Sequence, residues 1–312
     1  MTGRVVSIGE ALVDMIEVDS DLGQTYLAAW GGSPLNVAVG AARLGSEVEF
    51  AGSFAHDALG DKMLAFLSQE GVGTDLCPRI DSVYTTIAMT TFVNAEPQYA
   101  FYANPASYGF LPPSTANRAQ IADADVVHSG SLVVIEDTSY EAITECFAAS
   151  RGIITFDPNV RPRMVSDWEE YRRRLGYLIN QAHFVKFSIE DIDAAYPGQT
   201  AESIAMATLD GPTQAVLVTR GGDPVSLYSH DSHTELPLPG LFPVNDTTGG
   251  GDATMAGLVH QLAETGLPAS HDGWVDYSQN ALVVASIVSS RRGGAIAMPT
   301  AAEVRETGAW TT

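Results

Sequence analysis

Short apolar runs rich in β-branched residues alternate along the chain with longer stretches whose apolar positions recur with a helical period. Such short, nearly continuous runs are typical of strands that are buried on both faces of a parallel sheet. The runs fall at residues 5–9, 48–52, 126–130, 153–156, 183–187 and 215–219. Their alternation with helices predicts an α/β fold, a doubly wound and mainly parallel sheet with helices on both faces.

Several helix boundaries are marked by local signals. Ser33 and Pro34 are expected to open an alanine-rich helix that Gly45 ends, because proline suits the first turn of a helix and glycine suits its end. Two further helices are expected to begin at capping boxes, in which a hydroxyl and an acid three residues later satisfy backbone N–H groups reciprocally. These boxes are Thr138 with Glu141 and Ser166 with Glu169.

Two segments interrupt this alternation and predict a small additional sheet. Residues 13–18 form one, and residues 85–93 and 98–103, separated by the turn-like sequence NAEP, form the other. Both are rich in β-branched and aromatic residues, which favour strands. Because they interrupt the α/β order and do not follow it, we expect a lid over one edge of the main sheet, built from segments at about 11–30 and 84–104.

Composition narrows the class of protein. The 312 residues contain no repeat or linker-like segment, so we expect one domain over residues 1–312. A formal charge of -22 disfavours nucleic acid and anionic membranes as partners and favours a small ligand. Cys77 and Cys146 stand alone, which argues against a disulfide framework or a thiolate metal site. Acids near the N-terminus and the lack of a long apolar run argue against a signal peptide or a membrane span, so a cytoplasmic protein is expected.

The stretch NDTTGGGDATMAGL at 245–258 places three glycines before an aspartate where a helix begins. The free N–H groups of Gly249, Gly250 and Gly251, with the positive end of the helix, can form an anion site that a phosphate approaches closely because no Cβ stands in the way. Asp252 could then accept a proton from an attacking hydroxyl. Taken alone, an aspartate in a first helical turn is more often a capping residue. The chain has neither a P-loop nor a GxGxxG fingerprint.

These residues resemble a known family. DTTGGGD (246–252) is similar to the DTxGAGD signature of ribokinase-like sugar kinases of the phosphofructokinase-B type, and GGSPLN (31–36) is similar to the GGxxxN sugar-binding motif of that family. Further similarities follow in the same order along the whole chain. The resemblance implies a ribokinase-like fold with a lid, ATP and Mg²⁺ as cofactors and a small sugar as substrate. It also implies that Asp252 is the general base and that Gly249, Gly250 and Gly251 form the anion hole.

The resemblance implies a sugar site assembled from several segments. Asp14 lies where the family carries its sugar-binding aspartate, and a carboxylate there can accept hydrogen bonds from adjacent hydroxyls. The backbone of Gly32 and the amide of Asn36 can contact another side of the sugar. FDPNVR (156–161) resembles fructokinases and 2-keto-3-deoxygluconate kinases and makes Arg161 a sugar contact, with Phe101 from the lid. For Asp14 the alternative is an exposed acid at a strand end, and for FDPNVR it is a plain turn after a strand.

A nucleotide and metal site is implied by the segments that follow. In KFSIED (186–191), Ser188 and Asp191 take the places of the family's NxxE motif, and Glu190 is a neighbouring acid for water-mediated Mg²⁺ binding. The alternative is a helix N-cap followed by acids that compensate the helix dipole. Four further nucleotide contacts lie in VTRGGDPV and near the C-terminus. They are Thr219, Gly221, Asn280 and Gly294, with a hairpin turn and a helix C-cap as alternatives. Asp246 and the carbonyl near Thr248 are expected to hold K⁺ or another monovalent cation.

The acceptor is expected to be a neutral sugar, with fructose as the first choice. In many fructokinases and 2-keto-3-deoxygluconate kinases an arginine follows the aromatic pair of the lid strand, but here Ala103 follows Tyr102. The missing arginine weakens the case for an acidic sugar. A 2-keto-3-deoxygluconate kinase and a nucleoside kinase of the same fold stay open, as does a non-catalytic sugar-binding sensor, which Gly250, Pro224 and Asp191 suggest as departures from the family pattern. Exposed lid edges favour a homodimer through the lid.

Overall fold

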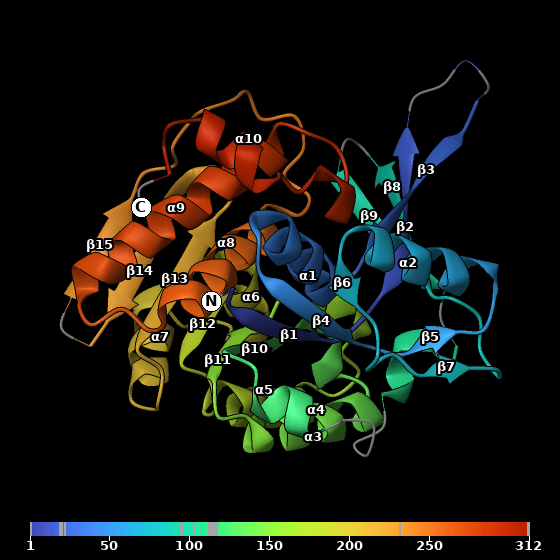
Figure 1. Cartoon of the computed structure of the whole chain (residues 1–312), viewed down its shortest axis with the longest axis horizontal. Helices are drawn as coiled ribbons and strands as arrows, with labels where there is room; N and C mark the ends of the chain where they lie inside the picture. The colour runs from blue at the N-terminus through green and yellow to red at the C-terminus, as the bar shows by residue number, and fades with distance from the viewer. Residues whose placement is uncertain are drawn as a thin grey trace.

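The computed structural model describes residues 2–18, 21, 23–93, 96–102, 104–111, 118–230 and 232–310 (Figure 1). Within these residues the main sheet has nine strands in the order β15-β14-β13-β12-β11-β10-β1-β4-β6. The strands from β13 to β6 pair in parallel, and β14 and β15 extend the sheet antiparallel to their neighbours. Their bounds are β1 (Arg4–Ile8), β4 (Glu47–Ala51), β6 (Val72–Gly73), β10 (Val126–Gly130), β11 (Ile153–Asp157), β12 (Phe184–Ser188), β13 (Ala215–Arg220), β14 (Asp223–Ser229) and β15 (Ser232–Leu236).

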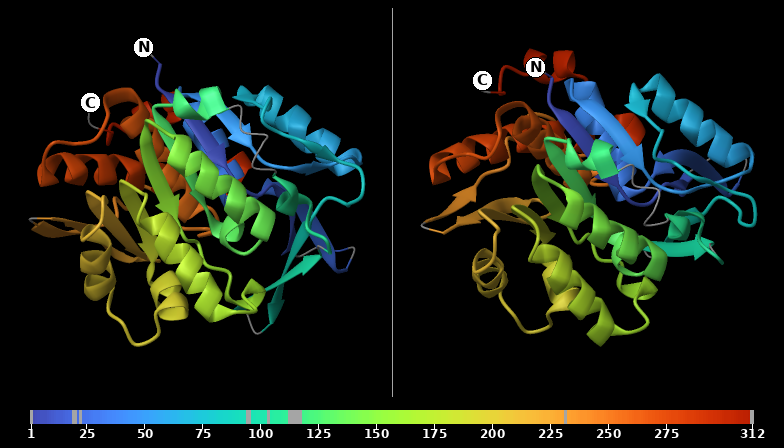
Figure 2. Two further views of the ribbon diagram at one scale, coloured as in Figure 1. Left: turned by 90° about the horizontal axis from the view of Figure 1, so that it is seen from below. Right: turned by 60° about the horizontal axis from the view of Figure 1, so that its bottom comes forward.

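Helices cover both faces of this sheet (Figure 2). One face packs against α1 (Ser33–Leu44), α2 (Ala58–Gln69), α8 (Gly250–Thr265) and α9 (His271–Ser289), and the other against α3 (Arg118–Ala122), α4 (Asp137–Ala149), α5 (Trp168–Ile179), α6 (Ile189–Ala195) and α7 (Ala201–Leu209). Neighbouring strand residues point to opposite cores: Val5 packs with the first group and Val6 with the second. This is why most positions of the central strands are apolar and do not alternate with polar ones. The predicted doubly wound α/β fold is confirmed.

Shorter elements complete the chain. They are α10 (Ala301–Glu306), the 3₁₀ turns η1 (Ser107–Phe110), η3 (Ser131–Val134), η4 (Pro162–Met164) and η5 (Ala295–Ala297), and the strand pair β5 (Phe54–Ala55) and β7 (Arg79–Ile80). No helix in the described part of the chain combines the length and apolar character that crossing a bilayer would require.

A separate four-stranded sheet forms the predicted lid, with strand order β3-β2-β8-β9. Its strands are β2 (Leu12–Val18), β3 (Thr25–Gly31), β8 (Ile87–Val93) and β9 (Glu96–Tyr102). Leu12 and Ala88 pack with Tyr108 and Leu132 from η1 and η3, which attaches the lid to the body. Figure 1 shows it beside the β6 end of the main sheet. Asn94, Ala95 and Ala103 lie outside the described residues.

The boundary of α1 is confirmed, whereas the two predicted capping boxes are wrong. α1 begins at Ser33 and ends at Gly45, whose φ is 120°. α4 starts at Asp137, so Thr138 lies inside it. α5 is capped by Asp167, whose carboxylate accepts hydrogen bonds from two backbone N–H groups of the first turn. An aspartate that satisfies two donors leaves Ser166 outside the helix.

Two glycines allow α8 to pack closely against its neighbours. A Cβ on Gly40 of α1 would lie 2.6 Å from the Cβ of Ala256, and one on Gly257 would lie 2.9 Å from the Cα of Ala281 in α9. Such separations are too short for real carbon atoms. The close contact fixes the position of α8, whose first turn carries the glycine-rich stretch.

We therefore expect Gly257→Ala to destabilise the protein by about 1–3 kcal/mol, because the added methyl group overpacks the helix contact. Gly176→Ala in α5 is the matched control, since a Cβ there meets nothing within 4 Å. It should stabilise the protein by about 0.5–1 kcal/mol through the higher helix propensity of alanine. Urea unfolding measures both. Equal effects of the two substitutions would contradict the close packing.

Candidate functional site

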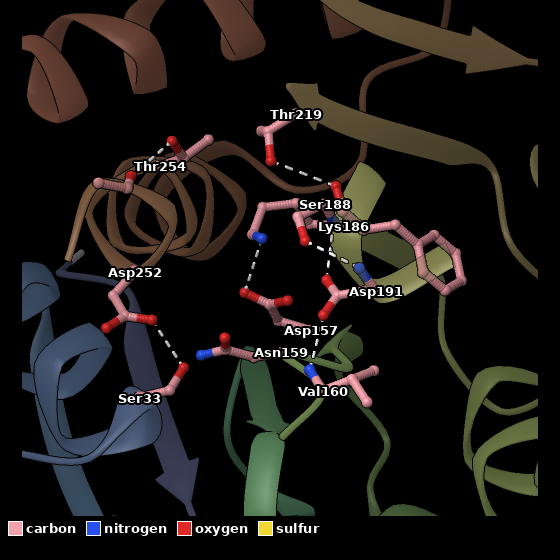
Figure 3. Close-up of polar contacts among 12 residues, drawn as sticks. Ser33, Asp157, Asn159, Val160, Lys186, Ser188, Asp191, Thr219, Asp252 and Thr254 are labelled. Atoms are coloured by element: carbon pink, nitrogen blue, oxygen red, sulfur yellow. Dashed lines mark hydrogen bonds and ion pairs between the residues drawn. The ribbon is translucent and has the colours of Figure 1, made fainter. Parts of the chain in front are cut away.

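The carboxyl ends of the parallel strands bring several polar residues, among them the predicted Ser188 and Thr219, to one edge of the sheet. Glu10 follows β1, Asp157 ends β11, Ser188 ends β12 and Thr219 lies near the end of β13. In open α/β sheets, ligands bind outside these strand ends. Figure 3 shows the first turn of α8 facing the same space, with Asp252 directed toward α1.

Asp252 is held by the first turn of α1. One carboxylate oxygen accepts a hydrogen bond from Ser33 Oγ and the other from Asn36 Nδ2, both at 2.7 Å. The side chain is 7% exposed. Burial raises the pKa of Asp252, and the two hydrogen bonds together with the charges of Arg161 and Lys186 oppose this rise. The carboxylate therefore faces the predicted sugar-binding residue Asn36, which distinguishes it from an ordinary capping aspartate.

The three glycines form a tight cradle at the start of α8. Gly249 is left-handed, with φ 80°. A Cβ on it would lie 3.3 Å from Gly294 Cα, one on Gly250 would lie 3.3 Å from Ser289 Oγ, and one on Gly251 would lie 3.4 Å from Lys186 Nζ. The absence of side chains lets neighbouring segments approach a helix N-terminus. The prediction of a free N–H group is wrong for Gly250, whose N–H donates to the Thr247 carbonyl at 3.1 Å because the loop turns there, so an anion would have to share this donor. A helix N-terminus without side chains can bind a phosphate group.

The sugar-side residues also come together. Asp14 lies on β2 with its carboxylate against Gly31, where any Cβ would clash with it. Burial raises the pKa of Asp14 to about 6; Arg161 lowers this pKa and Asp252 raises it, so the three charges share one environment. Gly32 has φ 110° and precedes α1. Phe101 is half-buried and packs against the small core of the lid.

Arg161 is oriented by its own loop. Its guanidinium donates to the carbonyl oxygen and the side-chain oxygen of Asn159 at 3.2 and 2.7 Å. Residues 158–160 form neither a turn nor a bend, so the turn expected as the alternative is not seen, and the charge of Arg161 acts on Asp14 and Asp252.

Two of the predicted nucleotide-side and metal residues, Ser188 and Asp191, make structural hydrogen bonds. Ser188 and Asp191 form a capping box on α6, and the Asp191 carboxylate also accepts from the backbone N–H of Val160 at 2.6 Å. Both of its oxygens are thus engaged, which is the structural alternative for this motif. Glu190 is exposed beside it. Thr219 lies next to Ser188 on β13, and Gly221 turns the chain into β14 with φ 57°.

The loop before α8 is tied to the end of α9. Asp246 N–H donates to the carbonyl of Ser289, and the Asp246 carboxylate accepts from Thr248 N–H at 2.9 Å. Among the described residues no group of three or more His, Cys, Asp or Glu side chains could hold a metal ion. Mg²⁺ fits this site only as an ion held by nucleotide phosphates and water, which is its usual mode of binding.

Comparison with known proteins identifies the family. The sequence profile of the "pfkB family carbohydrate kinase" matches residues 2–301. The chain belongs to the pfkB family of carbohydrate kinases. It is 31% identical to a fructokinase of Rhizobium leguminosarum bv. trifolii over 83% of this chain and 79% of that protein. It is also 28% identical to fructokinase-1 of Zea mays over 96% of both chains. The crystal structure of a fructokinase with bound ATP from Xylella fastidiosa superposes with a TM-score of 0.90 at 27% identity, covering 98% of each chain.

The predicted ribokinase-like fold and the assignment as an ATP-dependent sugar kinase are therefore confirmed. One predicted nucleotide contact of this pfkB kinase also joins two helices. Asn280 is 4% exposed and donates to Gln261 Oε1 at 2.8 Å, between α9 and α8. It precedes Ser289, which faces the glycine cradle, by about 14 Å of helix. Its contact with the adenine end of a nucleotide stays a prediction.

Sequence reasoning missed Glu10 in this pfkB kinase, although the residue lies in the GEALVD segment. Glu10 is 2% exposed, and its Oε1 accepts from Ser33 N–H at 3.0 Å, so it fixes the start of α1. Burial raises the pKa of Glu10 to about 7, against the hydrogen bonds and the charge of Arg161. The signal available in the sequence was an acid directly after a buried strand.

This raised pKa predicts a specific dependence of stability on pH. Between about pH 4.5 and about pH 7 folded Glu10 keeps a proton that the unfolded chain has lost, so the wild type loses about 2 kcal/mol of stability from this group between about pH 5.5 and about pH 8.5, with the loss complete once pH exceeds the folded pKa. Glu10→Gln keeps the acceptor for Ser33 and lacks the charge, so it should gain stability relative to the wild type as pH rises. Urea unfolding at both pH values measures the difference, with the exposed Glu141→Gln as control. A difference that does not change with pH would refute the buried charge.

Proposed function

We propose that this pfkB kinase transfers the γ-phosphoryl group of ATP to a primary hydroxyl of fructose. The observation that carries the proposal is the link between Asp252 at the glycine cradle and Asn36 at the predicted sugar site, through a hydrogen bond of 2.7 Å. Fructokinase relatives at 28 to 31% identity support the choice of sugar.

In the proposed reaction the fructose hydroxyl lies beside Asp252. Its oxygen forms a bond to the γ-phosphorus while the bond from that phosphorus to the β-γ bridging oxygen breaks, and ADP leaves. The hydroxyl proton passes to the Asp252 carboxylate. The N–H groups of Gly249, Gly250 and Gly251 and the positive end of α8 stabilise the charge on the transferring group. Because Ser33 and Asn36 occupy the carboxylate in the free protein, the sugar hydroxyl has to share or replace these donors.

The other site residues have supporting roles in this proposal. Asp14, the Gly32 backbone, Asn36, Phe101 and Arg161 hold the sugar, and Ser188, Thr219, Gly221 and Gly294 line the nucleotide. Mg²⁺ on the nucleotide phosphates would neutralise their charge and would be held through water by Glu190 and Asp191. Asp246 and the carbonyl near Thr248 would bind K⁺. We further propose that residues 1–312 act as one cytoplasmic domain.

A neutral sugar suits the charges of the site better than an acidic one. Glu10 and Asp252 are buried there and Asp14 is half-buried, and the Arg161 guanidinium that faces them also donates to its own loop. A sugar carboxylate would add to this excess of negative charge and would compete with Asn159 for the guanidinium. This supports fructose over 2-keto-3-deoxygluconate.

Release of ADP from MgATP, measured with fructose, ribose, glucose, 2-keto-3-deoxygluconate, inositol and adenosine, tests this function. We expect turnover with fructose and a loss of about 10³-fold or more in kcat/KM for Asp252→Asn, because the base is removed while its hydrogen-bonding shape is kept. Turnover only with 2-keto-3-deoxygluconate or adenosine would overturn the choice of sugar. Sugar binding by calorimetry without turnover on any acceptor would instead indicate a sensor.

We also propose a homodimer through the lid. Leu27 on the edge strand β3 is 40% exposed and Tyr102 on the opposite edge strand β9 is 61% exposed, so both edges present apolar surface. Size-exclusion chromatography with light scattering should give the mass of a dimer for the wild type and of a monomer for Leu27→Glu. A monomer at every concentration of the wild type would refute the dimer.

A further inference from the structure

A buried ion pair lies beside the glycine cradle and has no part in the function proposed above. Lys186 on β12 is 3% exposed and Asp157 at the end of β11 is 1% exposed, and Lys186 Nζ lies 3.0 Å from Asp157 Oδ2. The chain has only two lysines, and the other, Lys62, is exposed on α2.

The lysine is placed against the first turn of α8. Its Nζ lies 3.4 Å from the position of a Cβ on Gly251. In Figure 3 the ammonium group is directed at Asp157 on the side of the site that faces α8. The positive end of a helix repels a cation, so this position is unfavourable unless anions offset it.

The groups that face Lys186 show which anions do so. Burial alone would lower the pKa of Lys186, but Asp157, Asp191 and Asp252 outweigh it and raise this pKa, so the lysine is charged. On the remaining side His128 of β10 is fully buried, with its pKa lowered to about 3 by burial and by Lys186, and is therefore neutral. The cation thus has carboxylates on three elements and the glycine cradle beside it.

The ion pair of Lys186 and Asp157 is not explained by a need to stabilise the two strands. Within the described residues, the Asp157 carboxylate has no hydrogen-bond partner beyond its ion-pair contact with Lys186. A buried pair with so few additional hydrogen bonds is often no more stable than apolar side chains of the same size. A fixed cation in a buried site, however, interacts strongly with charge that develops nearby.

We propose that Lys186, oriented by Asp157, is a positioning residue of the phosphoryl-transfer centre, where its charge supports the glycine cradle in stabilising the transferring group. The inference rests on the proposed function and deepens it. Lys186 adds a positive charge behind the backbone N–H groups, at the helix end where negative charge builds up during transfer. Asp157 keeps the ammonium group in place and limits the cost of burying it.

The test uses Lys186→Met and the double variant Lys186→Met/Asp157→Asn, with Lys62→Met as the matched control. We expect kcat to fall about 10²-fold in both Lys186 variants while KM for the sugar changes by less than about threefold. The double variant removes both charges and should restore any thermal stability that the single variant loses. A double variant with wild-type stability and wild-type kcat would show that the pair is only structural.

A pH profile gives a second readout that a structural role would not change. Lys186 and Arg161 favour the ionised form of Asp252, whereas the nearby Asp14 and Asp157 carboxylates disfavour it. Loss of Lys186 should therefore move the acidic limb of kcat to higher pH in Lys186→Met, by less in the double variant because the opposing Asp157 charge is lost with it, and not at all in Lys62→Met. An unmoved limb in Lys186→Met would overturn the proposal.

Calorimetric binding of ADP with aluminium fluoride, which mimics the transferring group, separates this inference from the proposed function. We expect affinity at least tenfold weaker in both Lys186 variants and unchanged in Lys62→Met. If the wild type turns over no acceptor but shows this pattern, the proposed function fails and the role of Lys186 at the anion site stands. Equal affinity in all variants refutes that role, whether or not the wild type is active.

Discussion

The hydrogen bonds from Ser33 and Asn36 to Asp252 connect the starts of two helices that lie more than 200 residues apart in the chain. α1 follows directly from the lid strand β3, whereas α8 carries the glycine cradle. The arrangement depends on close packing of the helices, because the small residues between α1, α8 and α9 bring the two N-termini within reach of one another. The sugar side and the phosphate side of the site are therefore parts of one packed unit.

Charge is distributed unevenly across this unit. The carboxylates of Glu10, Asp157 and Asp252 are buried near the strand ends and that of Asp14 is half-buried, whereas Arg161 and Lys186 are the cations that face them in the described structure. Burying acids in excess of bases costs stability. The excess suits a site that binds hydroxyl groups and metal-bound phosphates, since carboxylates accept hydrogen bonds from the former and attract the cations of the latter.

The sequence was sufficient for the layout and for much of the site, because both depend on local patterns. Buried strands read as apolar runs, and DTTGGGD and GGSPLN are continuous segments. The cap of α5 was placed wrongly because neighbouring residues compete for the same backbone donors, as Asp167 does with Ser166, whereas α4 begins one residue before Thr138 without a side-chain cap. The hydrogen bond of Asn280 to Gln261 was not foreseen because sequence does not show which side of a helix faces its neighbour.

The ion pair of Lys186 and Asp157 shows a different limit. The two residues are 29 positions apart and meet because Phe156 pairs with Val185 in the parallel register of β11 and β12, which places the next residues side by side. Register follows from the packing of the whole sheet and cannot be read from either strand alone. Glu10 was likewise visible only as an acid after a strand until its contact with Ser33 was known.

Asn36 has a consequence for how the two substrates are bound. Its side chain bonds to Asp252 and also packs against Gly294, where a Cβ would lie 2.8 Å from Asn36 Nδ2. In the proposed complex, a sugar that shifts this amide would therefore change its contact with the loop that precedes η5, on the nucleotide side of the site. The two binding equilibria are then thermodynamically linked, and the factor by which the nucleotide changes the affinity for sugar is the factor by which the sugar changes the affinity for nucleotide.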